Sequence, residues 1–197
     1  MISYVEGKVD HIEPTFAVLD VQGLGYEIKI SLNTYADIKD LTKCRLHTWL
    51  NVKEDSHTLF GFSKPDEKAI FLLLVSVSGV GPSIGLMMTS SMTVEEIRQA
   101  IASEDVTTIQ SVKGIGGKTA QRVILELKDK IRKEGVVPFV DNSVAGNLKN
   151  LKNEALTALT TLGINKIQAE KSLELILKSA SNNITLEELI KQALKRA

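Results

Sequence analysis

The sequence predicts an α+β protein of several modules: an N-terminal β-barrel of the OB type, a central helical domain and a small C-terminal three-helix domain. Three observations predict this fold. Short alternating strands fill the first part, one glycine-containing motif occurs twice in a helical middle, and a stretch rich in turn residues precedes the last helices. We place the modules at residues 1–63, 64–135 and 148–197, with residues 136–147 as a flexible linker.

The first module shows the period-two alternation of half-buried strands, at residues 16–21, 26–31 and 46–52. Residues 22–25 provide a turn between two of these strands, and residues 32–41 predict a short helix that crosses between the third and fourth strands. Several short strands with one helix inserted midway are typical of a small closed barrel.

One hairpin tip of this module, residues 53–56, carries two adjacent carboxylates, Glu54 and Asp55. Asp and Ser favour turns because they bond their own backbone, so these residues by themselves fit an ordinary turn. Two neighbouring carboxylates at a tip can also repel phosphate groups. The choice between an ordinary turn and a phosphate-repelling tip depends on where the tip lies in an assembly.

The central module contains one short sequence twice: residues 76–85 read SVSGVGPSIG and residues 111–120 read SVKGIGGKTA. In both copies Gly, a branched apolar residue and Gly separate two helices, which is the pattern of a helix-hairpin-helix motif. We expect both glycines to adopt backbone angles that side chains forbid, with the next amide N–H groups pointing outward to bind phosphate. We expect Val80 and Ile115 to insert between the helices and make each hairpin rigid.

A single Gly-x-Gly turn between helices can be no more than a tight connection. Two copies in one small region favour binding to the DNA backbone, because phosphate contacts position a protein on DNA without reading the base sequence. The candidate phosphate-binding residues are Gly79, Val80, Gly81, Ser83, Lys113, Gly114, Ile115, Gly116, Lys118, Thr119 and Arg122.

The distribution of charge supports this interpretation, although the formal net charge is zero. Between Lys113 and Lys133 there are seven basic residues, and the only acids are Glu126 and Asp129. Such a local excess can form an electrostatic footprint for nucleic acid. A solvated helix face is the alternative, because Glu126 and Lys130 form an ordinary i,i+4 pair.

The helices of the central module follow from their apolar faces and caps. Residues 66–77 predict a helix that ends at the first hairpin, and a second helix follows at once. Thr93 and Glu96 form a capping box before a short helix at residues 94–102. Residues 117–133 predict a long helix whose core stripe consists of Ala120, Val123, Ile124 and Leu127.

Beyond the linker we expect three short helices, at about residues 148–162, 165–180 and 185–196. A domain of about fifty residues leaves little room for a catalytic cleft and favours a partner-binding module. In so small a domain the apolar side chains are expected to form the core rather than a contact surface: Leu173, Ile176, Leu177, Leu186, Leu189 and Ile190.

A nucleotide-binding loop is excluded. Gly117-Lys118-Thr119 matches the end of a P-loop, but that motif requires a glycine where this sequence has Val112, and a strand where a short polar helix precedes. A DNA glycosylase, which also uses such a hairpin, needs a base pocket, and no aromatic residue surrounds Asp129. A protein-interaction scaffold with purely structural hairpins is the remaining alternative.

Metal and membrane chemistry are not expected. The three histidines lack metal-ligand spacing, and the lone Cys44 fits a buried structural thiol, so we predict no metal and no cofactor. The longest apolar run, residues 69–77, is too short to span a bilayer, and no secretory leader is present. We therefore expect a cytoplasmic protein without a membrane partner.

Several segments together resemble the RuvA family of bacterial Holliday-junction recognition proteins. They are MISYVEG at residues 1–7, GLGY at 23–26, KED at 53–55 with FGF at 60–62, and GIGGKTA at 114–120 with ELKD at 126–129. The resemblance covers the whole chain in order. It implies a non-catalytic homotetramer that holds a four-way DNA junction open and square, and that a second tetramer can close.

The resemblance also implies partners and processes. The C-terminal domain would bind RuvB, the hexameric ATPase that drives branch migration, and a resolving nuclease, RuvC, can join. These proteins act in homologous recombination, DNA repair and the SOS response.

Carried onto this sequence, the resemblance implies that both hairpins grip phosphates through the minor groove. Glu54 and Asp55 would be acidic pins that fourfold symmetry gathers at the crossover, which reverses the ordinary-turn interpretation. The family commonly has lysines where this chain has Ser83 and Gly117, whereas Lys118 is retained and Lys113 can compensate. We therefore expect a weaker salt dependence of DNA binding than in a lysine-richer relative.

Overall fold

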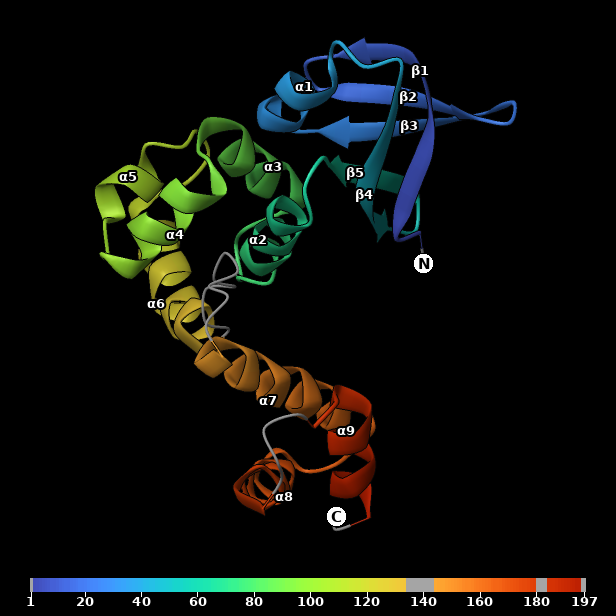
Figure 1. Ribbon diagram of the computed structural model, residues 1–197. Helices are drawn as coiled ribbons and strands as arrows, with labels where there is room; N and C mark the ends of the chain where they lie inside the picture. Colours follow the sequence, from blue (N-terminus) through green and yellow to red (C-terminus); the bar gives the residue numbers. More distant parts are fainter. Residues whose placement is uncertain (1, 134–143, 180–183, 196–197) are drawn as a thin grey trace. The chain divides into compact units, whose positions relative to one another are not determined.

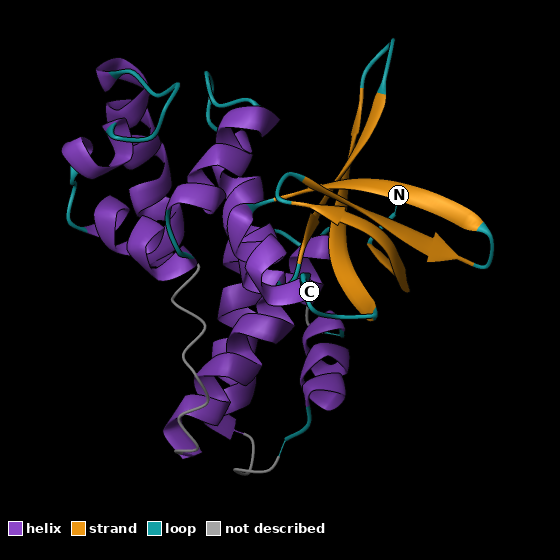
Figure 2. Cartoon of the chain, turned by 90° about the horizontal axis from the view of Figure 1, so that it is seen from above, coloured by secondary structure: helices purple, strands orange, loops and turns teal. Residues whose placement is uncertain are grey.

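The computed structural model describes residues 2–133, 144–179 and 184–195, and the chain divides into two compact units, Met1–Val136 and Val137–Ala197. The described strands all belong to the first unit, where Figure 2 shows them gathered in one module beside helices. The mixed α+β class predicted from the sequence is confirmed. None of the described helices is long and apolar enough to cross a membrane.

The N-terminal module is a closed barrel (Figure 1). Its strands run in the order β1-β2-β3-β5-β4, and β3 pairs with β5 in parallel while the other neighbours pair antiparallel. The strands are β1 (Tyr4–Glu13), β2 (Phe16–Val21), β3 (Leu24–Ile30), β4 (Lys43–Val52) and β5 (His57–Phe62). Helix α1 (Leu32–Ile38) crosses between β3 and β4, as predicted.

Alternate side chains of the strands fill the barrel. Ala17, Leu19, Ile28 and Leu46 are fully buried, because the strand pleat directs every second side chain inward. Cys44 is buried among them, and burial raises the pKa of its thiol, which fits the structural role expected for it.

The helical part of the first unit is built on one continuous apolar core. Its helices are α2 (Pro65–Val75), α3 (Pro82–Ser91), α4 (Val94–Ala102), α5 (Val106–Gln110) and α6 (Gly117–Lys133). The predicted capping box is present: Glu96 N donates to Thr93 Oγ1 at 3.2 Å, and Thr93 N donates to Glu96 Oε2 at 2.8 Å. The stripe predicted for the long helix is buried, with Ala120, Val123 and Leu127 at 0% exposure.

Phe71 joins the helices to the barrel. This α2 side chain is fully buried, and its ring centroid lies 4.8 Å from that of Phe62 and 5.5 Å from that of Phe60, both on β5. The ring of Trp49, on β4, lies 5.6 Å away. Aromatic pairs at such distances stabilise beyond their buried area, so the first unit is a single body.

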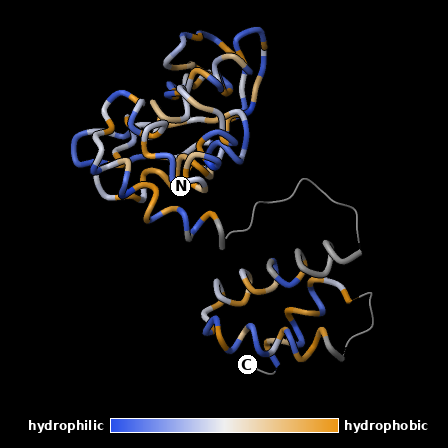
Figure 3. Tube along the Cα trace, turned by 90° about the vertical axis from the view of Figure 1, so that its left-hand side faces the viewer, coloured by the Kyte–Doolittle hydropathy of each residue, from blue (hydrophilic) through white to orange (hydrophobic). Residues whose placement is uncertain are grey.

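The second unit contains α7 (Val144–Thr161), α8 (Lys166–Ser179) and α9 (Leu186–Leu194). Figure 3 shows apolar residues recurring along these helices. Leu173, Ile176 and Leu189 are buried together, and the other three residues predicted for the core pack against them. The core role predicted for this set is therefore confirmed.

One boundary at the predicted linker differs from our prediction. Helix α7 begins at Val144, so residues 144–147, which we had assigned to the linker, are helical. Val and Ala enter a helix at small cost, and a glycine costs about 1 kcal/mol in a helix interior, which a helix this long tolerates in its first turn. The other predicted linker residues, 136–143, lie outside the described part of the chain.

Candidate nucleic-acid interface

The two hairpins have the same backbone geometry. The first glycine of each has a positive φ, +94° at Gly79 and +95° at Gly114, where an L side chain is strained. Val80 N donates to Val77 O at 3.0 Å, and Ile115 N donates to Val112 O at 3.1 Å. The repeated sequence therefore produces a repeated turn.

The second glycine of each hairpin differs from our expectation. Gly81 has φ −81° and ψ 168°, which any residue adopts, and Gly116 is not among the positive-φ glycines. A Cβ atom built on Gly81 or Gly116 meets nothing within 4 Å. The protein's own backbone and packing therefore do not require glycine at these positions, which leaves open space over the backbone there.

Each hairpin leads directly into a helix N-terminus. The first intrahelical bonds are donated by Gly85 N to Gly81 O and by Ala120 N to Gly116 O, both at 2.9 Å. The amides that precede these donors have no intrahelical acceptor, and the positive end of the helix dipole favours an anion there. Because Pro82 lacks an N–H group, α6 offers one more such donor than α3.

The central residues of the hairpins are core residues, as predicted. Val80 is 4% exposed and Ile115 is 5% exposed, and both belong to the same apolar cluster. The two turns are therefore anchored in one apolar core.

The hairpins also contact each other reciprocally. A Cβ on Gly79 would lie 3.9 Å from the Thr119 side chain, and a Cβ on Gly114 would lie 3.8 Å from Ile84 Cγ1. Ile84 and Thr119 hold equivalent places in the two copies of the motif. This internal two-fold relation places the two helix N-termini beside one another as a pair.

The predicted basic side chains fall into two groups. Lys113 and Lys118 are exposed, as is Ser83, and the two lysines form no ion pair with described residues. Arg122 Nη1 instead donates to Ser78 O, in the first hairpin, at 3.2 Å. This bond links α6 to the first hairpin. Because a guanidinium has five N–H donors, other donors of Arg122 remain for a ligand.

Other residues of the basic cluster have partners outside the hairpins. Lys130 Nζ donates to Ser76 Oγ at 3.2 Å, just before the first hairpin. Lys128 forms an ion pair with Glu104, and this pair holds the pKa of the Glu104 carboxyl below its usual value. Among the basic side chains that the structure describes between Lys113 and Lys130, the unpaired lysines Lys113 and Lys118 therefore lie at the second hairpin.

The tip between β4 and β5 is a tight exposed turn. Lys53 N donates to Ser56 O at 2.8 Å, and Glu54 and Asp55 are exposed at its end. Ser56 Oγ donates to Asp55 Oδ1 at 3.3 Å, which is the local bonding expected of a turn. Both carboxylates thus face solvent on a projecting hairpin.

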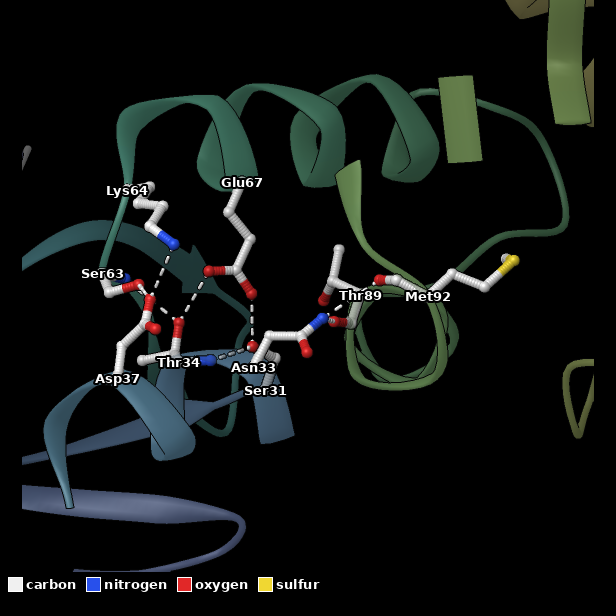
Figure 4. Close-up of polar contacts among 9 residues, drawn as sticks. All are labelled: Ser31, Asn33, Thr34, Asp37, Ser63, Lys64, Glu67, Thr89 and Met92. Atoms are coloured by element: carbon white, nitrogen blue, oxygen red, sulfur yellow. Dashed lines mark hydrogen bonds and ion pairs between the residues drawn. The ribbon is translucent and has the colours of Figure 1, made fainter. Parts of the chain in front are cut away.

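Sequence reasoning missed a polar network where the barrel meets the hairpin helices (Figure 4). Its centre is Glu67, a carboxylate that is only 4% exposed. Burial raises the pKa of Glu67, while hydrogen bonds from Ser31 and Thr34 oppose that shift. The signal was present, because Glu67 lies three and seven residues before Ile70 and Leu74, on the apolar face of α2.

The described residues contain no group of three or more His, Cys, Asp or Glu side chains that could hold a metal ion.

A closed barrel joined to paired helix-hairpin-helix motifs defines a multidomain helix-hairpin-helix protein. Family profiles match all three parts: "RuvA N terminal domain" at residues 1–61, "SAM-like Helix-hairpin-helix tandem" at 71–129, and "RuvA, C-terminal domain" at 150–197. The chain belongs to the RuvA family.

Full-length relatives agree with these profiles. A protein of Cytophaga hutchinsonii is 57% identical and covers 99% of both chains, and one of Christiangramia forsetii is 50% identical over 100% of both. A Bacteroides fragilis protein is 39% identical, again over the full length of both. Each is named "Holliday junction branch migration complex subunit RuvA".

Proposed function

We propose that this protein is a structure-specific DNA-binding subunit that recognises four-way junctions and works with RuvB in branch migration. The observation that carries the proposal is the reciprocal pair of hairpins, Gly79–Gly81 and Gly114–Gly116, with open space over each second glycine. The names of its full-length relatives support the same assignment.

The hairpins would bind two neighbouring phosphates of one duplex arm. At the second hairpin the amides of Gly117, Lys118 and Thr119 precede the first intrahelical donor, and the Lys118 ammonium adds a charge. At the first hairpin the Ser83 and Ile84 amides and the Ser83 hydroxyl would serve. Such contacts bind any sequence, so recognition depends on the arrangement of the arms.

The acidic tip would make DNA binding depend on the arrangement of the arms. In a homotetramer the four Glu54–Asp55 tips would meet at the crossover, where eight carboxylates disfavour close phosphates and keep the exchanging strands apart. A second tetramer could then cover the opposite face of an open, square junction.

The C-terminal unit would dock RuvB, which supplies the ATP-driven step, and RuvC would join to resolve the junction. This chain would have no catalytic role of its own and would act in the cytoplasm, in recombination and DNA repair. The small size of the unit and its own apolar core support a docking module.

A competition experiment tests the proposal. Binding to a synthetic four-way junction is compared with binding to linear duplex of the same sequence, in Mg²⁺ at near-physiological salt, for the wild type and for Gly114→Val and Gly116→Val. We expect a junction preference in the wild type and weak binding to both substrates in the variants. Equal wild-type affinity would reduce the hairpins to a general DNA grip, and no binding would make them structural.

A further inference from the structure

The barrel and the hairpin helices meet through two kinds of contact. One is the aromatic cluster around Phe71. The other is polar: α1, which belongs to the barrel, forms hydrogen bonds to α2 and α3, the two helices that flank the first hairpin. Asp37 of α1 also pairs with Lys64 at the start of α2, and Lys68 of α2 donates to Ser3 O. Apolar packing is non-directional, whereas hydrogen bonds weaken steeply away from their preferred angle, so the second set fixes orientation.

Glu67 receives the bonds on the α2 side. Thr34 Oγ1 donates to Glu67 Oε2 at 2.7 Å, and Ser31 Oγ donates to Glu67 Oε1. Each of these hydroxyl oxygens also accepts a hydrogen bond: Thr34 Oγ1 from Ser63 N at 3.1 Å, and Ser31 Oγ from Thr34 N at 3.0 Å. Figure 4 shows the carboxylate reaching from α2 toward the start of α1.

Asn33 makes the bonds on the α3 side. Its Nδ2 donates to Thr89 O at 2.7 Å and to Met92 O at 3.1 Å, where α3 ends. Leu32 N donates to Ser90 Oγ at 3.1 Å on the same helix. Adjacent residues of one short helix, Asn33 and Thr34, are therefore bonded to different helices of the hairpin module.

We propose that Glu67 and Asn33 are positioning residues that fix the direction in which the barrel carries its β4–β5 tip relative to the paired hairpins, and so set the preference for junctions over duplex. The inference rests on the proposed function, because it assigns DNA contact to the hairpins and the crossover to the tip. A duplex engages the hairpins alone. A junction engages hairpins and tips together, so it depends on the angle between them.

Nearly isosteric substitutions test this inference in the full-length protein. Asn33→Asp replaces the donating amide by a carboxylate that faces two carbonyl oxygens, and Thr34→Val removes the hydroxyl that donates to Glu67. Thr34→Ser keeps that hydroxyl and is the matched control. Glu6→Gln is a second control, because the ion-pair partners of Glu6, Lys43 and Arg45, both belong to strand β4 of the barrel.

The readout is the ratio of junction affinity to duplex affinity, with circular dichroism to establish folding. We expect this ratio to fall at least fivefold in Asn33→Asp and Thr34→Val, with duplex affinity within twofold of wild type and both controls unchanged. If Asn33→Asp does not fold, Ser90→Ala, which removes the acceptor of Leu32 N and a local bond to Leu86 O within α3, should lower the ratio at least twofold.

Two outcomes would overturn the inference: an unchanged ratio in the folded variants, or an equal loss of affinity for both substrates. A wild-type protein without junction preference would instead overturn the proposed function, and the inference with it. The wild-type and variant measurements thus separate the two failures.

Discussion

Gly114 and Gly116 lie two residues apart in the second hairpin and are subject to different constraints. Gly114 has a φ of +95°, so alanine there is strained by about 1–2 kcal/mol even though its Cβ finds ordinary contacts. Gly116 is free of that strain, and its Cβ would point into open space. Folding therefore favours glycine at position 114, and under the proposed function the approach of a DNA backbone favours glycine at position 116.

This difference predicts that alanine at position 114 chiefly lowers stability, whereas alanine at position 116 chiefly weakens DNA binding. Gly114→Ala should lower the free energy of unfolding by about 1–2 kcal/mol. Gly116→Ala should lower it by less than about 1 kcal/mol, the usual cost of alanine at a helix N-cap, yet weaken duplex binding at least tenfold. Urea unfolding and fluorescence anisotropy measure the two effects. Full DNA affinity in Gly116→Ala would show that no backbone approaches that glycine.

Glu67 predicts a pH dependence of stability. Burial raises its pKa above the ordinary 4.5. The native state thus binds the proton more tightly than the unfolded chain does, so the contribution of Glu67 to stability rises as the pH falls toward 4.5 and is constant below it. Nearby Asp37 adds to the rise in the pKa of Glu67, and Lys64 opposes it.

We therefore expect the stability difference between wild type and Glu67→Gln to shift in favour of the wild type as the pH falls from neutral toward 4.5. Urea unfolding at several pH values measures this difference, in which other carboxylates largely cancel. Asp37, whose pKa is lowered chiefly by the Ser63 hydroxyl, loses its stabilising contribution as the pH falls below its ordinary 3.8, so Asp37→Asn provides a contrast of opposite sign at that lower pH. A pH-independent difference for Glu67→Gln would contradict the raised pKa.

Among the helices, α3 and α6 have N-termini that follow equivalent hairpin turns but carry different charges. Helix α6 begins with three amide donors and Lys118, whereas α3 begins with Pro82 and Ser83. Each phosphate contact by a cation contributes about 0.9 to the slope of log affinity against log salt. The salt slope therefore reports how many cations these helix N-termini bring to the DNA.

We expect Ser83→Lys and Gly117→Lys each to steepen the salt slope of duplex binding by about 0.9, and Lys118→Ala to flatten it by a similar amount. Both positions have room, since Ser83 is exposed and a Cβ on Gly117 meets Gln110 at an ordinary 3.6 Å. Lys128→Ala, which removes a lysine paired with Glu104, is the control and should change the slope less. Equal changes in all variants would indicate a diffuse charge effect instead of contacts at the hairpins.

Local signals predicted most elements correctly, because their determinants are close in sequence. The Thr93–Glu96 capping box and the repeated Gly-x-Gly turn involve bonds over a few residues. Glu67, by contrast, is bonded to residues 33 and 36 positions away, and Asn33 to residues 56 and 59 positions away. Tertiary packing determines which distant residues become partners, and the periodicity of apolar residues along the sequence does not reveal it.

At the scale of the whole molecule, the barrel and the hairpin module form one unit and the last three helices form another. The first unit holds the aromatic joint, the barrel core and the hairpin core, and the second has a core of its own. Under the proposed function, DNA contact and motor contact belong to units that have separate cores. This division makes the two activities separable by truncation.

A chain that ends at residue 135 should bind a four-way junction within about twofold of the full-length affinity, because the hairpins, the acidic tip and the Glu67 and Asn33 bonds all remain. It should fail to capture RuvB and fail to support ATP-driven branch migration, because α7 to α9 would be missing. Junction binding by mobility shift and RuvB capture on immobilised junction measure the two effects side by side. Junction affinity that falls together with RuvB capture would mean that the second unit contributes to DNA binding and that the two activities share a surface.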